Sequence, residues 1–420
     1  MIAALTVFIL AYIAIMWDRI PGAVVSILGA AAMVSIGILS QDDAVRRIDF
    51  NTLALLCGMM IVVGLLRKEG LFEYVAIRVI KIAGGKPWSI FVALCLFTAV
   101  MSALLDNVTT ILICLPITLA LADAFRMKPL PFIIGEIFFS NIGGTATLIG
   151  DPPNILIGSR APLGFMDFIY HNVPVVLVIA LCVLLFLRFF FRRDFGVVRE
   201  NAEEILAEFD ETRAIKDPPR TRRALLVFGL IIAGFVCSRL IHLELGTIAL
   251  GGAFLMVLVT KPGEIDEFLK EVEWPTIFFI TGLFVMVGAL EKTGFIKLIA
   301  NHLLTVTDDA TAMTLLILWT SALLSSFIEN VSFTATMISV IKSMGPLGGM
   351  DLQPLWWSLS LGVCLGGNAT LIGAAANIVA ASYARRNQCE ISFWRYFAIG
   401  FPLMIATIVI ATIYMLIVDL

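Results

Sequence analysis

Two pairs of polar stretches interrupt long apolar runs in this sequence, and their residue types suit ion or solute binding. Asp106-Asn107-Val108-Thr109 aligns with Glu329-Asn330-Val331-Ser332 at an offset of 223 residues. Gly143–Ile155 (GGTATLIGDPPNI) aligns with Gly366–Ile378 (GGNATLIGAAANI) at the same offset, with nine of thirteen positions identical. In lipid, irregular backbone is tolerated only where protein or a watery cavity satisfies its polar groups. Breaks at corresponding places of two halves predict the substrate site of a secondary transporter.

The groups at these breaks are carboxylates, amides, hydroxyls and exposed backbone. A carboxylate within the membrane costs about 2.5–3.5 kcal/mol and is functional by default, so we expect it to carry protons. The proton-coupling candidates are Asp106 and Glu329, followed by Asp151 and Glu136. The expected substrate-binding residues are Asn107, Thr109, Gly143, Gly144, Thr145, Thr147, Asn154, Asn330, Ser332, Gly366, Gly367, Asn368, Thr370 and Asn377.

Several of these residues have a simpler explanation as helix caps. Asp, Asn and Thr are good N-caps, and a re-entrant helix needs one. Asp151 followed by Pro152 is how a half-helix would begin, so Asp151 is either a cap or an ion ligand. Glu136, whose counterpart is Leu359, could carry a proton or snorkel to the interface. Cys364, just before the second glycine pair, is more typical of packing than of a soft ligand.

The composition indicates an integral membrane protein. The 420 residues are 60% hydrophobic and only 15% charged, with a mean hydropathy of +0.99. The seven cysteines and three histidines show no metal-ligand or disulfide spacing. We therefore expect neither a metal site nor a cofactor.

We predict an all-α polytopic membrane protein built from two inverted repeats of five transmembrane helices, each with a re-entrant hairpin and a broken helix. Residues 274–290 match 50–66 at an offset of 224, so the repeat extends beyond the polar motifs. Residues 71–84 predict an amphipathic interfacial helix, and 201–209 a short soluble one. The predicted units are a first repeat at 1–193 (hairpin 88–125, broken helix 131–158), a cytoplasmic linker at 194–223, and a second repeat at 224–420 (hairpin 311–343, broken helix 355–384).

The distribution of basic residues predicts the orientation. With five crossings in each half, 22 of the 29 Lys and Arg residues fall on one side and 7 on the other. Cytoplasmic loops carry the excess of positive charge. We therefore expect a multi-pass protein of the inner (cytoplasmic) membrane, with its long linker in the cytoplasm and both termini outside. Two full crossings in place of each hairpin would give the same parity, but the polar tips favour hairpins.

The motifs Ser102–Thr110 and Asn141–Asn154 resemble those of the ion transporter superfamily, within it the arsenical pump membrane protein, the P protein and the NhaD-type antiporters. The resemblance covers almost the whole chain. It implies inverted repeats, a transport domain made of the two hairpins and two broken helices, a scaffold of the remaining helices, and often a homodimer. Related dicarboxylate symporters carry Ser-Asn-Thr at the tips, whereas Asp106 and Glu329 precede the tip asparagines here.

The leading functional prediction is an antiporter that expels arsenite and antimonite in exchange for protons across the lipid bilayer. A sodium/proton antiporter of the NhaD type, or another small-ion or organic-anion transporter of the same superfamily, is the alternative, since oxygen ligands suit hard cations. The sequence has no Walker motif, so an ATPase would have to be a separate cytoplasmic subunit. We expect no enzyme activity, because no nucleophile–base pairing or HExxH motif occurs. We also expect no nucleic acid partner.

The predicted orientation can be tested with reporters. A reporter that is active only in the cytoplasm should be inactive when fused after Leu420 and active when inserted in the 194–223 linker. An active C-terminal fusion would reverse the predicted topology.

Overall fold

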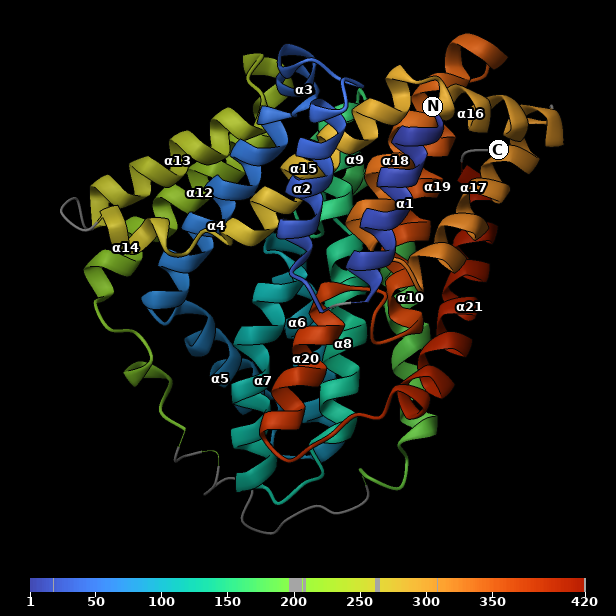
Figure 1. The fold of residues 1–420 in the computed structure, drawn as a ribbon. Helices are drawn as coiled ribbons and strands as arrows, with labels where there is room; N and C mark the ends of the chain where they lie inside the picture. Colours follow the sequence, from blue (N-terminus) through green and yellow to red (C-terminus); the bar gives the residue numbers. More distant parts are fainter. Residues whose placement is uncertain (18, 196–205, 207–208, 261–264, 308, 419–420) are drawn as a thin grey trace.

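The computed structural model describes residues 1–420 except 18, 196–205, 207–208, 261–264, 308 and 419–420. The described residues before the linker form ten helices (Figure 1). They are α1 (Ile2–Met16), α2 (Gly22–Ser35), α3 (Gln41–Arg47), α4 (Phe50–Lys68), α5 (Leu71–Ala83), α6 (Pro87–Leu104), α7 (Asn107–Ala124), α8 (Leu130–Thr145), α9 (Pro152–Arg160) and α10 (Phe165–Phe190).

The second half repeats this order after a short 3₁₀ turn, η1 (Glu211–Arg213). Its helices are α12 (Pro218–Ile241), α13 (Leu245–Thr260), α14 (Ile265–Leu269), α15 (Trp274–Lys292), α16 (Phe295–Val306), α17 (Ala310–Ser325), α18 (Asn330–Gly348), α19 (Gln353–Gly366), the 3₁₀ turn η2 (Gly367–Ala369), α20 (Ala375–Arg386) and α21 (Phe393–Val418). Of the described helices, seven are long and apolar enough to cross a membrane: α4, α6, α7, α10, α12, α15 and α21. The all-helical, polytopic fold is therefore confirmed.

The helices form two groups that each combine both halves of the chain. One group, here called the frame, contains α1–α4 and α12–α15. In it α2 packs on α15, and α4 packs on α13, so each half supplies a partner for the other. The other group, here called the hairpin bundle, contains α6–α9 and α17–α20 with η2. In Figure 1 the hairpin α6–α7 lies in the lower half and the hairpin α17–α18 in the upper half.

Glycines bring the frame helices into backbone contact at equivalent places. A Cβ atom on Gly58 would lie 2.5 Å from the backbone of Ala249 in α13. A Cβ atom on Gly282, its repeat counterpart, would lie 2.5 Å from the backbone of Ser26 in α2. Small residues allow this approach between membrane helices, where packing replaces the hydrophobic effect as the source of association. The two contacts hold the halves together.

Two further glycines turn the chain from the frame into amphipathic helices. Gly70 and Gly294 have φ of +78° and +83°, in the left-handed region that glycine adopts without strain. They precede α5 and α16, which lie between the frame and each hairpin. The predicted amphipathic helix at 71–84 corresponds to α5, but its counterpart α16 was not anticipated. The sequence contained a feature that could have predicted α16, because Gly294 aligns with Gly70 in the repeat.

The ends of α4 and α15 are held by ion pairs whose charges are exchanged between the repeats. Arg67 at the end of α4 pairs with Glu271 at 2.7 Å. At the equivalent positions, Glu291 at the end of α15 pairs with Arg47. The side chain of Glu271 lies against Gly64, and the side chain of Arg47 lies against the equivalent glycine, Gly288. The same joint therefore occurs at both ends of the frame with opposite polarity.

The sequence-based boundaries differ from the helices by a few residues. The predicted hairpins 88–125 and 311–343 correspond to α6–α7 and α17–α18, the latter ending at Gly348. The predicted broken helices 131–158 and 355–384 correspond to α8–α9 and α19–α20. The short helix proposed at 201–209 lies mostly outside the described residues. Ala214, near the end of the linker, lies directly against Gly70, where a Cβ atom would be 1.8 Å from the Ala214 carbonyl oxygen.

We expect the frame contacts to limit stability. Gly58→Ala or Gly282→Ala should destabilise the protein by about 1–3 kcal/mol, because a methyl group would meet backbone that cannot rotate away. The measurement is the melting temperature of the purified protein in detergent. Gly251→Ala in α13 is the control, since no atom lies within 4 Å of its Cβ position. Equal stability of all three variants would contradict this account of the frame.

Candidate functional site

Each hairpin tip carries an acidic residue that caps the second arm. Asp106 accepts a hydrogen bond from the backbone amide of Thr109 at 2.8 Å, and Glu329 accepts one from Ser332 at 2.8 Å. Both carboxylates are half-buried. Asp106 and Glu329 are thus N-caps, and each provides an acceptor for a backbone amide that has no partner within its helix. Asn107 and Asn330 follow as the first residues of α7 and α18 and are buried.

Each broken helix satisfies its own free carbonyls with one asparagine. The amide of Asn154 donates to the carbonyl oxygens of Gly144 at 3.3 Å and Thr147 at 3.0 Å. The amide of Asn377 donates to those of Gly367 and Thr370, both at 2.8 Å. A buried carbonyl without a partner would cost several kcal/mol in a membrane. Asn154 and Asn377 therefore fix the shape of the breaks, and their predicted part in substrate binding stays a prediction.

Serine and threonine hydroxyls tie each break to the neighbouring hairpin. Ser102 Oγ donates to the carbonyl oxygen of Ser140 at 2.5 Å, and Ser325 Oγ donates to that of Val363 at 2.9 Å. Hydroxyls from the breaks return the contact. Thr147 donates to the carbonyl oxygen of Ala103, and Thr370 to that of Ser326. These four bonds occur at equivalent positions, so they join the hairpin tip to the break in the same way in each repeat.

Glycines allow the close approach between break and hairpin. Cβ atoms on Gly143 and Gly366 would lie 2.5 Å and 2.8 Å from the Cα atoms of Ala99 and Ala322. Cβ atoms on Gly144 and Gly367 would lie 2.7 Å and 3.2 Å from the carbonyl oxygens of Gly150 and Gly373, across each break. At these positions the glycines serve helix packing in the described structure.

Both hairpins meet at one carboxylate, that of Asp151. Its Oδ1 accepts from Asn107 Nδ2 and from Asn330 Nδ2, each at 3.4 Å. Asp151 is 1% exposed, and its Oδ2 has no hydrogen-bond partner among the described residues. It precedes α9, but its side chain makes no capping bond. The Asp151 side chain is therefore not a cap in this structure, and its role as an ion ligand stays a prediction.

A cluster of asparagines surrounds this carboxylate. Asn141 Oδ1 accepts from Asn107 at 3.3 Å, and Asn141 Nδ2 donates to the side-chain oxygens of Asn368 and Asn377, both at 3.0 Å. Asn141 thereby links the two breaks. Asn368 is fully buried and its Nδ2 has no partner among the described residues. One unpaired carboxylate oxygen and one unpaired amide thus lie in the same polar cluster.

Sequence reasoning missed Asn141, Ser360 and Asn172 as members of this cluster. Ser360 Oγ donates to Asn154 Oδ1 at 2.7 Å, and Asn172 Nδ2 donates to Ser360 Oγ at 3.1 Å and to the Thr145 carbonyl oxygen at 2.8 Å. Their polarity inside apolar helices was the available signal. Cys364, the repeat counterpart of Asn141, also reaches Asn154 Oδ1, at 3.6 Å.

The remaining sequence candidates lie at the edge of the cluster or outside it. Thr109 contributes its backbone amide to the Asp106 cap. The Ser332 hydroxyl is buried without a partner among the described residues, and its carbonyl oxygen accepts from Tyr12 at 2.7 Å. Thr145 Oγ1 donates to the Asn141 carbonyl oxygen at 2.7 Å. Glu136 is fully buried and accepts from Thr118, so it does not snorkel.

The cluster has acidic and amide groups but no basic side chain among the described residues that form it. Four helices, α7, α9, α18 and α20, begin at this point and direct their partly positive N-termini toward it. These termini offset the negative charges of Asp106, Asp151 and Glu329. The arrangement suits a ligand that both donates and accepts hydrogen bonds, or a cation, together with a proton on Asp151.

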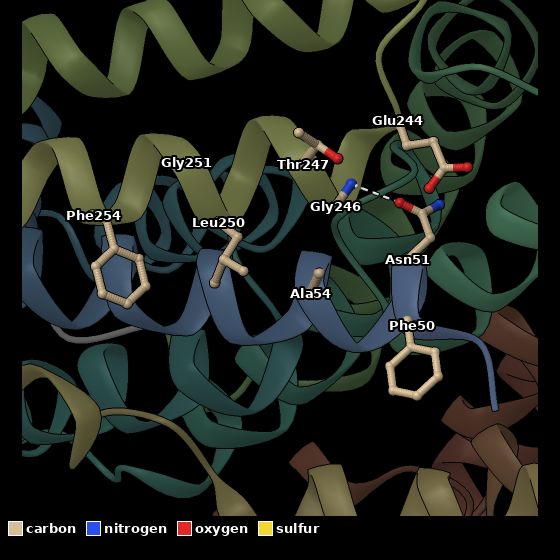
Figure 2. Close-up of a pocket in the computed structure, with 9 residues that line it drawn as sticks. All are labelled: Phe50, Asn51, Ala54, Glu244, Gly246, Thr247, Leu250, Gly251 and Phe254. Atoms are coloured by element: carbon tan, nitrogen blue, oxygen red, sulfur yellow. Dashed lines mark hydrogen bonds between the residues drawn. The ribbon is translucent and has the colours of Figure 1, made fainter. Parts of the chain in front are cut away.

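A separate cavity lies in the frame. It has a volume of about 530 Å³ and lies between α4 and α13, lined among others by Ala54, Leu250 and Phe254. Figure 2 shows Asn51 at its polar end, where its side-chain oxygen accepts from the Gly246 amide at 2.8 Å. Because the cavity belongs to the frame and opens between apolar helices, it is separate from the asparagine cluster.

Comparison with known proteins places the chain among transporters. Residues 12–362 match the family model described as citrate transporter. An uncharacterized transporter of Mycobacterium bovis is 39% identical over 99% of this chain and 97% of its own length. The human P protein is 30% identical over 97% of this chain and 58% of its own length. The crystal structure of the Alcanivorax borkumensis YdaH transporter has a TM-score of 0.62 at 13% identity, covering 96% of this chain and 97% of that one, and so shares its fold.

We expect Asn141 to be the main structural link of the cluster. Asn141→Ala should lower the unfolding free energy by about 2–3 kcal/mol, because it leaves the buried side-chain oxygens of Asn368 and Asn377 without their donor and removes one of the two acceptors of Asn107. Asn301→Ala, at an exposed position of α16, is the control and should be neutral. Melting curves in detergent give both values. A neutral Asn141→Ala would mean that the amides find other partners.

Proposed function

The chain belongs to the citrate transporter family, and from this premise we propose that it is a secondary transporter that exports arsenite and antimonite in exchange for protons. The observation that carries this proposal is the convergence of Asn107 and Asn330 on the buried carboxylate of Asp151. Family membership points to transport rather than to an enzyme reaction. The substrate and the coupling ion are the proposed part.

The chemistry of the cluster supports a small neutral hydroxylated substrate. Arsenous acid is a neutral triol, so it can donate to carboxylate and amide oxygens and accept from amide nitrogens. Asp151 Oδ2 and Asn368 Nδ2 are an acceptor and a donor without partners among the described residues, which is what such a ligand requires. A ligand bound at Oδ2 would share the Asp151 carboxylate with the tip asparagines on Oδ1, and its binding would therefore be coupled to both hairpins.

We propose Asp151 as the principal proton carrier. It is the most deeply buried of the three acids in the cluster, and it accepts hydrogen bonds from the side-chain amides of Asn107 and Asn330. A proton on Asp151 removes a buried charge, and its loss creates an acceptor for the substrate hydroxyls. Asp106 and Glu329 act mainly through the local field, since each is committed to a cap. Glu136 remains a second candidate carrier, bonded to Thr118.

A sodium/proton antiporter is the second candidate. The favourable observation is again Asp151 Oδ2, a hard oxygen without a described partner, beside the side-chain oxygens of an amide cluster. Oxygen donors of this kind suit small hard cations. In this case the cation would replace the proton on Asp151 directly.

Citrate, which names the family, suits this cluster less well. A tricarboxylate is usually held by arginine or lysine, and Arg pairs bidentately with carboxylates. No basic side chain is among the described residues of the cluster, and Asp106, Asp151 and Glu329 would repel the substrate. For these reasons we do not extend the family's name to a substrate for this chain.

Orientation and partners complete the proposal. We propose that the protein lies in the inner membrane with its linker in the cytoplasm and both termini outside, as its basic residues favour. A homodimer follows from the superfamily resemblance. Any ATPase subunit would dock on the linker side.

The proposal is tested by proton flux in everted membrane vesicles. Arsenite and antimonite should each dissipate a preformed proton gradient, and sodium or lithium should not. Asp151→Asn should abolish the response, at least about 100-fold, because it keeps the size of the side chain but cannot exchange a proton. Asn107→Ala and Asn330→Ala should reduce it while membrane insertion is retained.

The tip acids give an internal comparison. Asp106→Asn should retain much of the flux, because asparagine is an equally good N-cap. If Asp106→Asn and Glu329→Gln abolish coupling and Asp151→Asn does not, the proton carrier is at the tips. A response to sodium alone would favour the second candidate, and growth protection that requires a co-expressed ATPase would point to a pump.

A further inference from the structure

The two broken helices are equivalent in sequence but are not equally attached to the frame. The half-helix α9 contacts α18, α19 and α4, whereas its repeat counterpart α20 contacts α7 and α8. The pairs α9–α18 and α20–α7 are equivalent, as are α9–α19 and α20–α8. The contact equivalent to α9–α4 would be α20–α15, and the described residues form no comparable contact there.

Asp49 is the residue that holds α9 on the frame. Its Oδ2 receives Arg160 Nε at 2.7 Å and Ser159 Oγ at 2.9 Å, both from the end of α9. Asn51 Nδ2 donates to the same Ser159 hydroxyl at 3.1 Å. The Asp49 carboxylate is 10% exposed, so this pairing is largely shielded from water.

Arg160 makes two further contacts with the frame. Its Nη2 donates to the Arg47 carbonyl oxygen at 3.0 Å, and its guanidinium lies 5.1 Å from the centre of the Phe284 ring in α15. One arginine thus contacts α3, the start of α4, and α15. Since α9 is only nine residues long and begins beside Asp151, this attachment is connected rigidly to the central carboxylate.

Glu273 is the repeat counterpart of Asp49, at an offset of 224. It precedes α15 as Asp49 precedes α4, but it accepts from the Thr276 hydroxyl at 3.2 Å, whereas Asp49 accepts from the backbone amide of Thr52 at 3.2 Å. Unlike Asp49, it has no ion pair among the described residues. It is half-buried. The second repeat therefore has the acceptor of the attachment but not, in this structure, its cation.

The end of α20 carries an arginine without an ion pair among the described residues. Tyr383 occupies the position equivalent to Arg160, and Arg386 lies one turn further on the same face of the helix. Arg386 is exposed and has no ion pair among the described residues, while its neighbour Arg385 lies 3.7 Å from Glu390. A shift of the hairpin bundle along the frame would bring this end of α20 toward Glu273 as it removes α9 from Asp49.

We infer that Asp49 and Glu273 are alternating docking carboxylates, which hold Arg160 of α9 in this conformation and Arg386 of α20 in the opposite one. Pseudo-symmetry requires that the two end states exchange the environments of the repeats. The structure is then one end state, with the first repeat docked. The inference rests on the proposed transport function but not on the identity of the substrate.

Disulfide crosslinking tests the alternation. The pair Asp49→Cys with Arg160→Cys should crosslink in the resting protein. The pair Glu273→Cys with Arg386→Cys should crosslink poorly at rest. Its crosslinking should rise about fivefold when Arg160→Gln removes the first ion pair, because the loss of a partly exposed ion pair changes an equilibrium by at most about that factor. The measurement uses proteoliposomes without metalloid, and the protein without introduced cysteines controls for the seven native ones.

Matched variants make the outcome decisive. Lys297→Gln removes an exposed cation of α16 that has no ion pair among the described residues, and it should leave the crosslinking unchanged. Glu267→Cys with Arg386→Cys should not respond to Arg160→Gln. If Glu273→Cys lowers the yield of protein, Thr276→Cys, one turn further along α15, replaces it.

The inference is overturned if Arg160→Gln leaves the Glu273/Arg386 crosslink unchanged, or if the Glu267/Arg386 pair responds equally. If the crosslinks alternate but arsenite and antimonite produce no proton flux, the docking inference stands and the substrate assignment fails. If flux occurs without alternation, the reverse holds.

Discussion

The structure depends on one constraint, which is that helices interrupted inside a membrane must find partners for their free backbone groups within the protein. At both breaks a single asparagine, Asn154 or Asn377, fills this role by donating to carbonyls on the other side of the gap. Each tip satisfies free amides through Asp106 or Glu329. The polar residues of the centre are thus required for folding before they can bind anything, and their unpaired atoms are what remain for a ligand.

The repeats agree in backbone but differ in the residues at the centre. In the alignment of the two repeats, the counterparts of Asp151, Asn141 and Glu136 are Ala374, Cys364 and Leu359. Two adjacent buried carboxylates cannot both ionise without a high cost. A single carboxylate that accepts from both tips avoids that cost and connects the two halves at one titratable group.

The frame shows how symmetry is kept while charge is not. Arg67–Glu271 and Glu291–Arg47 form the same joint with exchanged charges, so each end of the frame retains one ion pair made of one arginine and one glutamate. The unequal distribution of lysine and arginine that orients membrane proteins therefore comes from other residues of the chain. The unequal contacts of α9 and α20 with the frame are a second asymmetry, and the sequence differs there too, since Tyr383 occupies the position of Arg160.

The sequence alone determined the class of protein, the repeat and its offset, and the positions of both hairpins and both breaks, because apolar length and interrupted periodicity are local properties of the chain. It also identified Asn107, Asp151 and Asn330 as polar residues in an apolar setting. Only the tertiary structure decided that Asp151 is the shared acceptor and that Asp106 and Glu329 are caps. It also added Asn141, Ser360 and Asn172 to the site. These assignments depend on which helices from the two halves approach one another, and that arrangement is set by contacts between residues about 180 to 240 positions apart.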